Sequence, residues 1–427
     1  MQARILHQYL TECDLNICTD TRNIIKGSLF FALKGDNFNG NEFALQALEQ
    51  GAKYVVIDEE EYNTDKRCLK VKNVLKALQY LAQYHRRQFD IPVIGITGSN
   101  GKTTSKELMA AVLEKKYNTL VTEGNLNNHL GVPFTLLKLR PEHEIAVIEM
   151  GANKPGDIAE LAEFAEPNYG IITNVGKAHL EGFGSFENVI KTKCELYDAI
   201  EYSNGTVFIN SDDKILLKNA PAINLFTYGQ TGQIKVELVD LNPFLSFKWS
   251  AGHYSSEVVQ TNLVGNYNLS NFAAAVTIGY FFEVEETDIS EALSAYVPTN
   301  NRSQISKINT NTLIVDCYNA NVTSMKAALE NFKAINAKNK VAILGDMKEL
   351  GDVSLEEHQL VVDWLVENNM KATIVGPEFG KTKHSLTQFN TVEELIDSRK
   401  EKYQNSFVLL KGSRGIKLEK LIEADCF

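Results

Sequence analysis

The sequence contains no Cys-x-x-Cys pair, no run of about 18 apolar residues and no excess of basic residues. Its six scattered cysteines are typical of reduced thiols in a cytosolic protein, not of a disulfide scaffold. No transmembrane helix is predicted, and the first residues lack the apolar core of a signal peptide. The formal net charge of -11 argues against a nucleic-acid-binding protein. We therefore expect a cytoplasmic enzyme that neither inserts into a membrane nor binds nucleic acid.

The length and apolar content of the chain indicate several domains. The 427 residues, of which 44% are hydrophobic, are enough for two to four cores. Apolar strand patterns alternate with helical patterns, which predicts an α/β fold. We expect a small α/β domain over residues 1–90, a central parallel sheet over residues 91–300 and a Rossmann-like domain over residues 301–427.

The clearest motif is a strand, loop and helix that together resemble a phosphate-binding loop. A β-branched run from residue 92 to 97 leads into Gly98, Ser99, Asn100, Gly101, Lys102, Thr103 and Thr104, and a helical pattern covers residues 105–114. The glycines let backbone N–H groups turn inward, and the helix N-terminus adds partial positive charge. The lysine can reach the outer phosphates, and the first threonine can ligate Mg2+. The spacing of the two glycines departs from the longer standard phosphate-loop pattern. A glycine-rich turn with a surface lysine is therefore the alternative.

Two further residues are predicted at the same edge of the central sheet. An apolar run over residues 145–148 is followed by Glu149, and carboxyl ends of parallel strands meet where ligands bind. A carboxylate there suits a hard cation, although a solvated glutamate is the alternative. His179 follows the next predicted strand, and we expect it to contact metal or phosphate rather than to be purely structural. The following helix carries Lys191 and Lys193, and periodicity does not decide whether either faces the site.

Amide side chains gather in two segments. The stretch over residues 122–129 holds too many of them for a core and offers donors and acceptors to a ligand. Asn268 and Asn271 lie three residues apart on one predicted helix face, where they suit a purine edge, although Asn268 can equally cap the helix. In the last domain, the predicted strand ends offer Asp316, Asp346, Lys411 and Arg414, which indicates a charged edge on an interdomain cleft.

The order of these motifs resembles that of the Mur ligase family, which builds the peptide of bacterial cell-wall precursors. The resemblance spans all three domains and is carried by residues 97–104, 124–128, 149–152, 178–184, 316–321, 345–351 and 411–414. Within the family, the motifs are most similar to those of the member that joins D-Ala-D-Ala to UDP-N-acetylmuramoyl-tripeptide through an acyl phosphate.

The resemblance implies ATP and Mg2+ as cofactors and assigns residues to roles. Lys102, His179 and Lys193 would be catalytic, and Gly98 to Thr104 would bind ATP together with Asn268, Asn271, Arg302 and Asp316. Thr103, Glu149, His179 and Lys193 would hold Mg2+, with Lys193 carbamylated by CO2. The substrate-binding residues would be Thr21, Arg22, Lys34, Gly35, Asn37, Asn125, Asn127, Asn128, Tyr318, Asn319 and Asn321. A monomer is expected.

Two positions depart from the family pattern, and other functions are conceivable. Asn301 stands where the family usually has glycine, and Val322 stands where it usually has proline. Other possibilities are a different Mur-type or folylpolyglutamate-type ligase, or a nucleotide-gated binding protein. The folate enzyme begins close to its phosphate loop, whereas about ninety residues precede the loop here.

Overall fold

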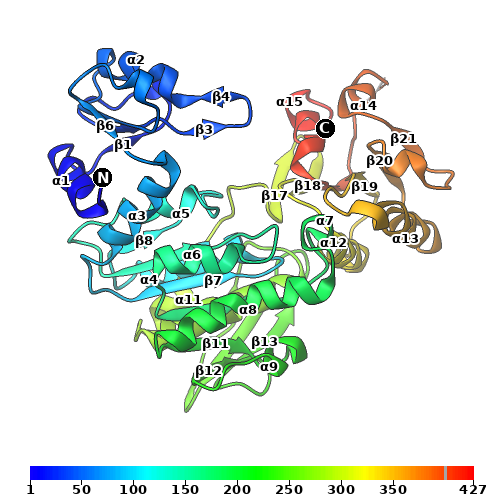
Figure 1. Ribbon diagram of the computed structural model, residues 1–427. Helices are drawn as coiled ribbons and strands as arrows, with labels where there is room; N and C mark the ends of the chain where they lie inside the picture. The colour runs from blue at the N-terminus through cyan, green and yellow to red at the C-terminus, as the bar shows by residue number, and fades with distance from the viewer. Residues whose placement is uncertain (399–401) are drawn as a thin grey trace.

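Three β-sheets flanked by helices follow one another along the chain (Figure 1). The computed structural model describes residues 1–398 and 402–427. The predicted α/β fold with parallel sheets is confirmed. None of the helices in these two ranges has the length and apolar character needed to cross a membrane.

The first unit is a four-stranded parallel sheet with strand order β1-β2-β5-β6. A separate two-stranded hairpin, β3-β4, projects from it toward the side of the third unit (Figure 1). The predicted polar loop over residues 34–40 is this hairpin. The elements are α1 (Ala3–Glu12), β1 (Ile17–Cys18), β2 (Leu29–Phe31), β3 (Lys34–Gly35), β4 (Phe38–Asn39), α2 (Ala44–Glu49), β5 (Tyr54–Ile57), β6 (Cys68–Lys70) and α3 (Val74–Arg86).

The central unit is a ten-stranded sheet in which β8-β9-β7-β10-β11-β12-β13 are parallel. Beyond β13 the strands β14, β15 and β16 pair antiparallel, so the sheet is mixed at one edge. Its elements are β7 (Val93–Thr97), α4 (Lys102–Leu113), β8 (Thr119–Val121), α5 (Gly131–Leu136), β9 (Ile145–Glu149), α6 (Asp157–Ala165), β10 (Tyr169–Ile172), α7 (Leu180–Phe183), α8 (Phe186–Tyr202), β11 (Thr206–Asn210), α9 (Lys214–Lys218), β12 (Asn224–Tyr228), β13 (Ile234–Asp240), β14 (Ser246–Ala251), β15 (Tyr254–Ser255), β16 (Val259–Gln260), α10 (Leu269–Phe281) and α11 (Glu286–Ala295).

The third unit is a six-stranded sheet with order β17-β18-β22-β19-β20-β21, parallel except for β17. Its elements are β17 (Gln304–Ile308), β18 (Asn311–Asp316), α12 (Val322–Ala334), β19 (Lys340–Gly345), α13 (Ser354–Glu367), β20 (Ala372–Val375), β21 (Thr387–Phe389), α14 (Val392–Ser398), β22 (Phe407–Lys411) and α15 (Lys420–Glu423).

Apolar cores also join the units. One cluster runs from the first sheet into one face of the central sheet and includes Phe31, Leu78 and Ile148. Val264 of the central unit is fully buried in a core of the third unit, and Phe244 packs against the same core. The central and third units therefore share an apolar contact as well as the linker that follows α11.

The two departures from the family pattern fit their backbone positions. Val322 is the first residue of α12, where proline is favoured because of its fixed φ, but valine is also accepted. Asn321 caps this helix through a reciprocal contact with Ser324. Asn301 has a φ of 56°, in the left-handed region that asparagine adopts more readily than most other non-glycine residues.

Candidate active site

The loop after β7 has the shape of a phosphate cradle. Gly98 and Gly101 have φ values of 145° and 79°, which L side chains rarely adopt. A Cβ atom on Gly98 would lie 2.0 Å from the hydroxyl oxygen of Thr173, and one on Gly101 would lie 2.4 Å from the Oδ1 atom of Asn271. Helix α4 begins directly at Lys102, three residues earlier than predicted, because Gly101 makes the turn into it. The loop therefore requires glycine at both positions.

Lys102 lies over the loop that precedes it. Its Nζ atom donates to the carbonyl of Gly98 at 2.8 Å and to that of Ser99 at 3.4 Å. Burial lowers the pKa of Lys102, the nearby Glu149 carboxylate opposes this, and the positive charge of Arg302 lowers the pKa further. An anion bound here would lie near the side chains of Lys102 and Arg302, which have few carboxylates around them.

Glu149 is the centre of a buried polar cluster beside the loop. In the sheet register it lies opposite Ile96, next to the start of the loop, and its side chain is fully buried. Its Oε1 atom accepts from Thr103 at 3.2 Å and from Asn127 at 2.7 Å. Its Oε2 atom has no hydrogen-bond partner among the described residues. A buried carboxylate oxygen left free in this way is suited to ligate a hard cation.

Lys106 completes this cluster, although no sequence pattern predicted it. Its side chain is only 1% exposed, and its Nζ atom lies 3.8 Å from Oε2 of Glu149. The same atom donates to the carbonyls of Thr122 at 2.6 Å and Gly124 at 3.3 Å, where the amide-rich segment begins. Burial lowers the pKa of Lys106, and the Glu149 carboxylate opposes that effect. Lys106 therefore links the phosphate-loop helix, the amide-rich segment and the end of β9.

The predicted asparagine pair is buried between α10 and α4. Asn271 donates to the side-chain oxygen of Asn268 at 2.8 Å and accepts from the hydroxyl of Ser105 at 3.0 Å. Asn268 occupies the position before α10, but its side chain makes no capping bond and donates instead to the carbonyl of Val264 at 2.7 Å. The helix-cap alternative is therefore wrong, and both amides border the pocket described below.

Aromatic and charged side chains of the third unit face the loop. The guanidinium carbon of Arg302 lies 3.7 Å from the ring centroid of Tyr318, and that of Arg414 lies 5.5 Å from the same centroid. Lys411, which is buried, donates to Asp316 at 2.5 Å. Of the charged strand ends predicted for this unit, Asp316, Lys411 and Arg414 line the cavity. Asp346 does not, because both of its carboxylate oxygens are bonded to backbone N–H groups inside the third unit.

The polar contacts between the central and third units include two that involve predicted site residues. Asn321 donates to the side-chain oxygen of Asn100 at 2.8 Å, so the residue that caps α12 also touches the phosphate loop. The Nδ1 atom of His179 forms an ion pair with the carboxylate of Glu349, and this contact lowers the pKa of Glu349. His179 has a φ of 52°, which places it in the left-handed region immediately before α7.

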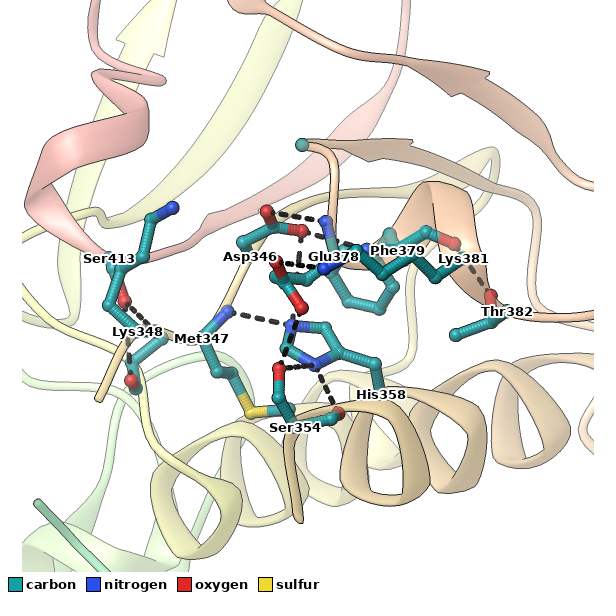
Figure 2. Close-up of polar contacts among 12 residues, drawn as sticks. Asp346, Met347, Lys348, Ser354, His358, Glu378, Phe379, Lys381, Thr382 and Ser413 are labelled. Atoms are coloured by element: carbon teal, nitrogen blue, oxygen red, sulfur yellow. Dashed lines mark hydrogen bonds and ion pairs between the residues drawn. The ribbon is translucent and has the colours of Figure 1, made fainter. Parts of the chain in front are cut away.

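The segment that carries Glu349 is fixed within the third unit by a buried network (Figure 2). Both carboxylate oxygens of Asp346 accept backbone N–H groups, from Glu378 and Phe379 at 2.9 Å each. The Nε2 atom of His358 accepts the N–H of Met347 at 3.0 Å, and its Nδ1 atom donates to a carbonyl. Burial lowers the pKa of His358, which agrees with a neutral ring in this arrangement.

Lys193 is buried on α8 behind His179. Its Nζ atom lies 5.7 Å from the ring centroid of Phe183, and the ring of His179 lies 6.5 Å from that centroid. Within residues 1–398 and 402–427 the Lys193 amine has no hydrogen-bond or ion-pair partner. Burial lowers the pKa of Lys193 well below its ordinary value, and the charge of Lys102 lowers it further. The uncharged amine is therefore favoured.

One cavity of about 820 Å³ brings most of the predicted residues together. The predicted residues that line it are Ser99, Asn100, Gly101, Lys102, Thr103, Thr104, Asn125, Asn127, Asn128, Glu149, His179, Asn268, Asn271, Arg302, Asp316, Tyr318, Asn319 and Asn321. Gly98 and Lys193 are adjacent to these but do not line it. Lysine, amide and carboxylate groups therefore face one space between the central and third units, as predicted.

The predicted residues of the first unit lie elsewhere. Arg22 is exposed and donates to Asp20, and Lys34 forms ion pairs with Asp58 and Glu59. None of the five residues Thr21, Arg22, Lys34, Gly35 and Asn37 lines the cavity. Their assignment to substrate binding stays a prediction.

Sequence reasoning missed several residues that belong to this site. Lys106 and Glu349 contact predicted metal ligands, and Lys348 and Ser413 line the cavity. Glu349 stands within a motif already noted for its resemblance, but nothing in the sequence shows that it contacts His179. Among the described residues, no three His, Cys, Asp or Glu side chains form a cluster able to hold a metal ion. Any ion here would therefore need ligands of other kinds, such as a hydroxyl group, phosphate or water.

The fold and site together define a phosphate-loop α/β protein whose nucleotide-type pocket is closed by a separate Rossmann-like unit. The chain matches the models for the Mur ligase middle domain over residues 96–279, the Mur ligase glutamate ligase domain over residues 301–414 and the Mur ligase family catalytic domain over residues 16–86. With these matches and the relatives below, the chain belongs to the Mur ligase family.

Its relatives in the family cover almost the whole chain. The UDP-N-acetylmuramoyl-tripeptide--D-alanyl-D-alanine ligase of Bacillus subtilis is 32% identical, with 95% of this chain and 92% of the relative aligned. The crystal structure of MurF from Acinetobacter baumannii is 32% identical with a TM-score of 0.84, over 96% of this chain and 92% of that one. MurF ligase from Thermotoga maritima in complex with ADP is 27% identical with a TM-score of 0.84, over 96% and 98%.

Proposed function

We propose that the protein uses ATP to join D-Ala-D-Ala to UDP-N-acetylmuramoyl-tripeptide, which gives the pentapeptide precursor of peptidoglycan. The observation that carries this is the shared cavity, in which the phosphate loop, the Glu149 carboxylate with its Oε2 atom outside any hydrogen bond from the described residues, and the charged edge of the third unit face one another. Relatives that align over nine-tenths of the chain are named for this reaction, and one was solved with ADP.

The proposed ATP site uses the groups that converge on the loop. Lys102 and the loop N–H groups would hold the phosphates, with Arg302 approaching from the linker. Asn268 and Asn271 would border the adenine, and Asp316 the ribose. The support for this assignment is that all five side chains line the same cavity.

The donor set beside the loop suits Mg2+. Glu149 offers a buried Oε2 atom that accepts no hydrogen bond from the described residues and lies 3.8 Å from the Nζ atom of Lys106, and the hydroxyl of Thr103 bonds to its Oε1 atom. His179 stands on the same cavity and would be a third ligand. When bound, Mg2+ would neutralise the phosphate charge that builds up during transfer.

The proposed reaction has two steps. First, a carboxylate oxygen of the tripeptide attacks the γ-phosphorus of ATP, the bond to the bridging oxygen breaks, and ADP leaves an acyl phosphate. The amine of D-Ala-D-Ala then attacks the acyl carbon, phosphate leaves with the bonding electron pair, and the amine gives up a proton. Lys102 and Arg302 would stabilise charge on the transferring group, and the third unit would exclude water.

Lys193 is proposed to carry a carbamate. Its amine nitrogen would attack the carbon of CO2, one C=O electron pair would move to oxygen, and a proton would leave to solvent. The burial that favours its uncharged form supports this, because only an uncharged amine has the lone pair required. The resulting anion would lie beside the ring of Phe183, which also neighbours the ring of His179.

The first unit is proposed to hold the UDP end of the substrate. Arg22 and Lys34 offer exposed cations, and Asn37 lies at the tip of the β3-β4 hairpin. A diphosphate would compete for these cations with their present carboxylate partners. We further propose that the protein works as a monomer in the cytoplasm, where its six scattered cysteines would stay reduced.

Phosphate release with matched substrate pairs tests this function. ATP and UDP-N-acetylmuramoyl-tripeptide are supplied with D-Ala-D-Ala, or the corresponding shorter precursor is supplied with L-Ala, D-Glu or a diamino acid. Turnover is expected only with the dipeptide. Turnover with a single amino acid would point to another Mur-type reaction, turnover with folate and glutamate to a folylpolyglutamate-type ligase, and nucleotide binding without turnover to a binding protein.

A further inference from the structure

The linker between the central and third units is tied to the phosphate-loop helix by one carboxylate. Glu107 lies on α4, five residues after Lys102. It accepts a hydrogen bond from the hydroxyl of Tyr296 at 2.5 Å and from the side-chain amide of Asn300 at 2.9 Å to each oxygen. Tyr296 is the C-cap residue that follows α11, and Asn300 lies two residues before Arg302. Glu107 therefore holds both ends of the short segment over residues 297–299.

The backbone on either side of Arg302 depends on such contacts. Asn301 and Ser303 have φ values of 56° and 51°, and a non-glycine residue in this region costs on the order of 1 kcal/mol. The hydroxyl of Ser303 is hydrogen-bonded to that of Tyr267 at 2.8 Å, and the carbonyl of Asn301 accepts from the third unit. Arg302 is thus presented from a strained turn that is anchored before it by Glu107 and after it by Tyr267.

The side chain of Arg302 is placed toward the phosphate loop with donors to spare. It stacks on Tyr318 at 3.7 Å and lines the cavity beside Thr103. Its buried Nε atom has no hydrogen-bond partner among residues 1–398 and 402–427. Its charge also reaches Lys102, whose pKa it lowers. An anionic ligand in the cavity would relieve both features.

We propose that Glu107 is a positioning residue for Arg302: by holding Tyr296 and Asn300, it aims the guanidinium at the polyphosphate of the bound nucleotide. This rests on the proposed function and adds the residue that sets the arginine in place. Glu107 itself points away from the loop to the linker, while its neighbour Lys106 is buried on the Glu149 side of the same helix. Lys106 and Glu107, which are successive residues of α4, therefore position two different sides of the site: the Glu149 side and the linker side.

A carboxylate is required because both linker groups are donors. Glutamine at position 107 would offer one oxygen and would turn an N–H group toward the amide of Asn300. Glu107→Gln therefore preserves size while it breaks one anchor. Tyr296→Phe and Asn300→Ala remove the donors from the linker and leave α4 unchanged, which keeps the test valid if Glu107→Gln folds poorly.

The test is a double-mutant cycle on nucleotide affinity, measured by calorimetry with the ATP analogue AMP-PNP and Mg2+ on the full chain. Arg302→Ala is expected to weaken binding about tenfold or more, because a charge-assisted contact is lost. Glu107→Gln and Tyr296→Phe are expected to weaken it about three- to tenfold. In the Arg302→Ala background, Glu107→Gln is expected to add nothing. Glu114→Gln, at the exposed end of the same helix, is the matched control and should bind as the parent does.

Each result has a defined meaning. Additive losses in the double variant, or parental affinity in both Glu107→Gln and Tyr296→Phe, would overturn the positioning role while the proposed function stands. Parental affinity in Arg302→Ala would overturn both the role of that arginine and the inference about Glu107. A parent protein that does not bind the analogue would overturn the proposed function itself.

Discussion

The carboxylate of Glu349 contacts the Nδ1 atom of His179 across the boundary between the third and central units. The carbonyl of Glu349 accepts from the N–H of Glu181, and the residues just before Glu349 are held by Asp346 and His358. A carboxylate beside Nδ1 leaves the other ring nitrogen available to the Mg2+ proposed above. The ring of His179 is therefore fixed only when the third unit lies against the central unit.

Replacing Glu349 tests this relationship. Glu349→Ala is expected to lower turnover about 10- to 100-fold and to raise the Mg2+ concentration needed for half-maximal rate, because the ring of His179 loses its orienting partner. Phosphate release measured across a Mg2+ series gives both values. The exposed Glu356→Ala variant on α13 is the control. Unchanged Mg2+ dependence in Glu349→Ala would contradict the assignment of His179 as a ligand.

Lys102 is the residue whose loss should be most damaging to chemistry. Lys102→Ala is expected to lower phosphate release about 100- to 1000-fold, since the transferring group loses a fixed positive charge. The thermal midpoint should change little, because Lys102 bonds only to carbonyls of its own loop. Lys115→Ala, beyond the end of α4, serves as the control. Near-parental phosphate release in Lys102→Ala would remove the phosphate loop from the mechanism.

The carbamate on Lys193 has a chemical signature. Lys193→Ala is expected to lose most activity, and added formate or acetate should restore part of it by supplying the missing carboxylate. Lys191→Ala, two residues earlier and exposed, should retain parental activity. Carbon-13 NMR of protein equilibrated with labelled bicarbonate should show a carbamate signal that Lys193→Ala lacks. A Lys193→Ala variant as active as the parent would eliminate the carbamate.

A buried histidine outside the site predicts how stability depends on pH. The Nδ1 atom of His85 is hydrogen-bonded to Nε2 of His7 at 2.9 Å, and its other nitrogen to the carbonyl of Leu139 at 3.1 Å. Burial lowers the pKa of His85 from 6.5 to about 4, and the charges of His7 and Arg140 contribute. The neutral ring is therefore the native form.

The sign of the effect follows from proton binding. Between pH 6.5 and about 4 the unfolded chain holds a proton on His85 that the native chain lacks, so stability falls as the pH falls through this range. The loss should approach about 3 kcal/mol. Urea midpoints measured from pH 7 to pH 4 should fall more steeply in the parent than in His85→Gln. The exposed His253→Gln variant should follow the parent, and an equally steep fall in His85→Gln would refute the prediction.

The parts of the site that could be predicted from sequence are those that lie in one continuous motif or at the ends of neighbouring strands. Gly98, Lys102 and Thr103 form one continuous motif, and Glu149 ends an apolar run whose parallel neighbour is the strand before the loop. Strand ends of one sheet must meet, so His179 and Asn127 could also be expected nearby. The helix at Asn268 was harder, because a capping residue and a residue that donates to a carbonyl look alike in sequence.

The contacts missed by the sequence are those set by packing between distant segments. Glu107 and Asn300 are 193 residues apart, and Lys106 reads as an ordinary solvent-facing lysine until β8 and β9 enclose it. Glu349 lies in a recognisable motif, yet its partner depends on how two units meet. Neither residue periodicity nor motif spacing predicts a contact between two units, because that contact depends on the angle between their sheets.

The apolar contact of Val264 and the polar contacts around the cavity differ in what it costs to expose them to water. Asn100 with Asn321, His179 with Glu349 and Lys177 with Glu357 can each exchange a partner for solvent at a cost of about 1 kcal/mol. Exposing Val264 would cost about 1.5–3 kcal/mol with no compensating bond. Swinging the third unit about Val264 is therefore cheaper than detaching it. Reaction products would then leave through the solvated edge of the cavity while the apolar contact at Val264 stays buried.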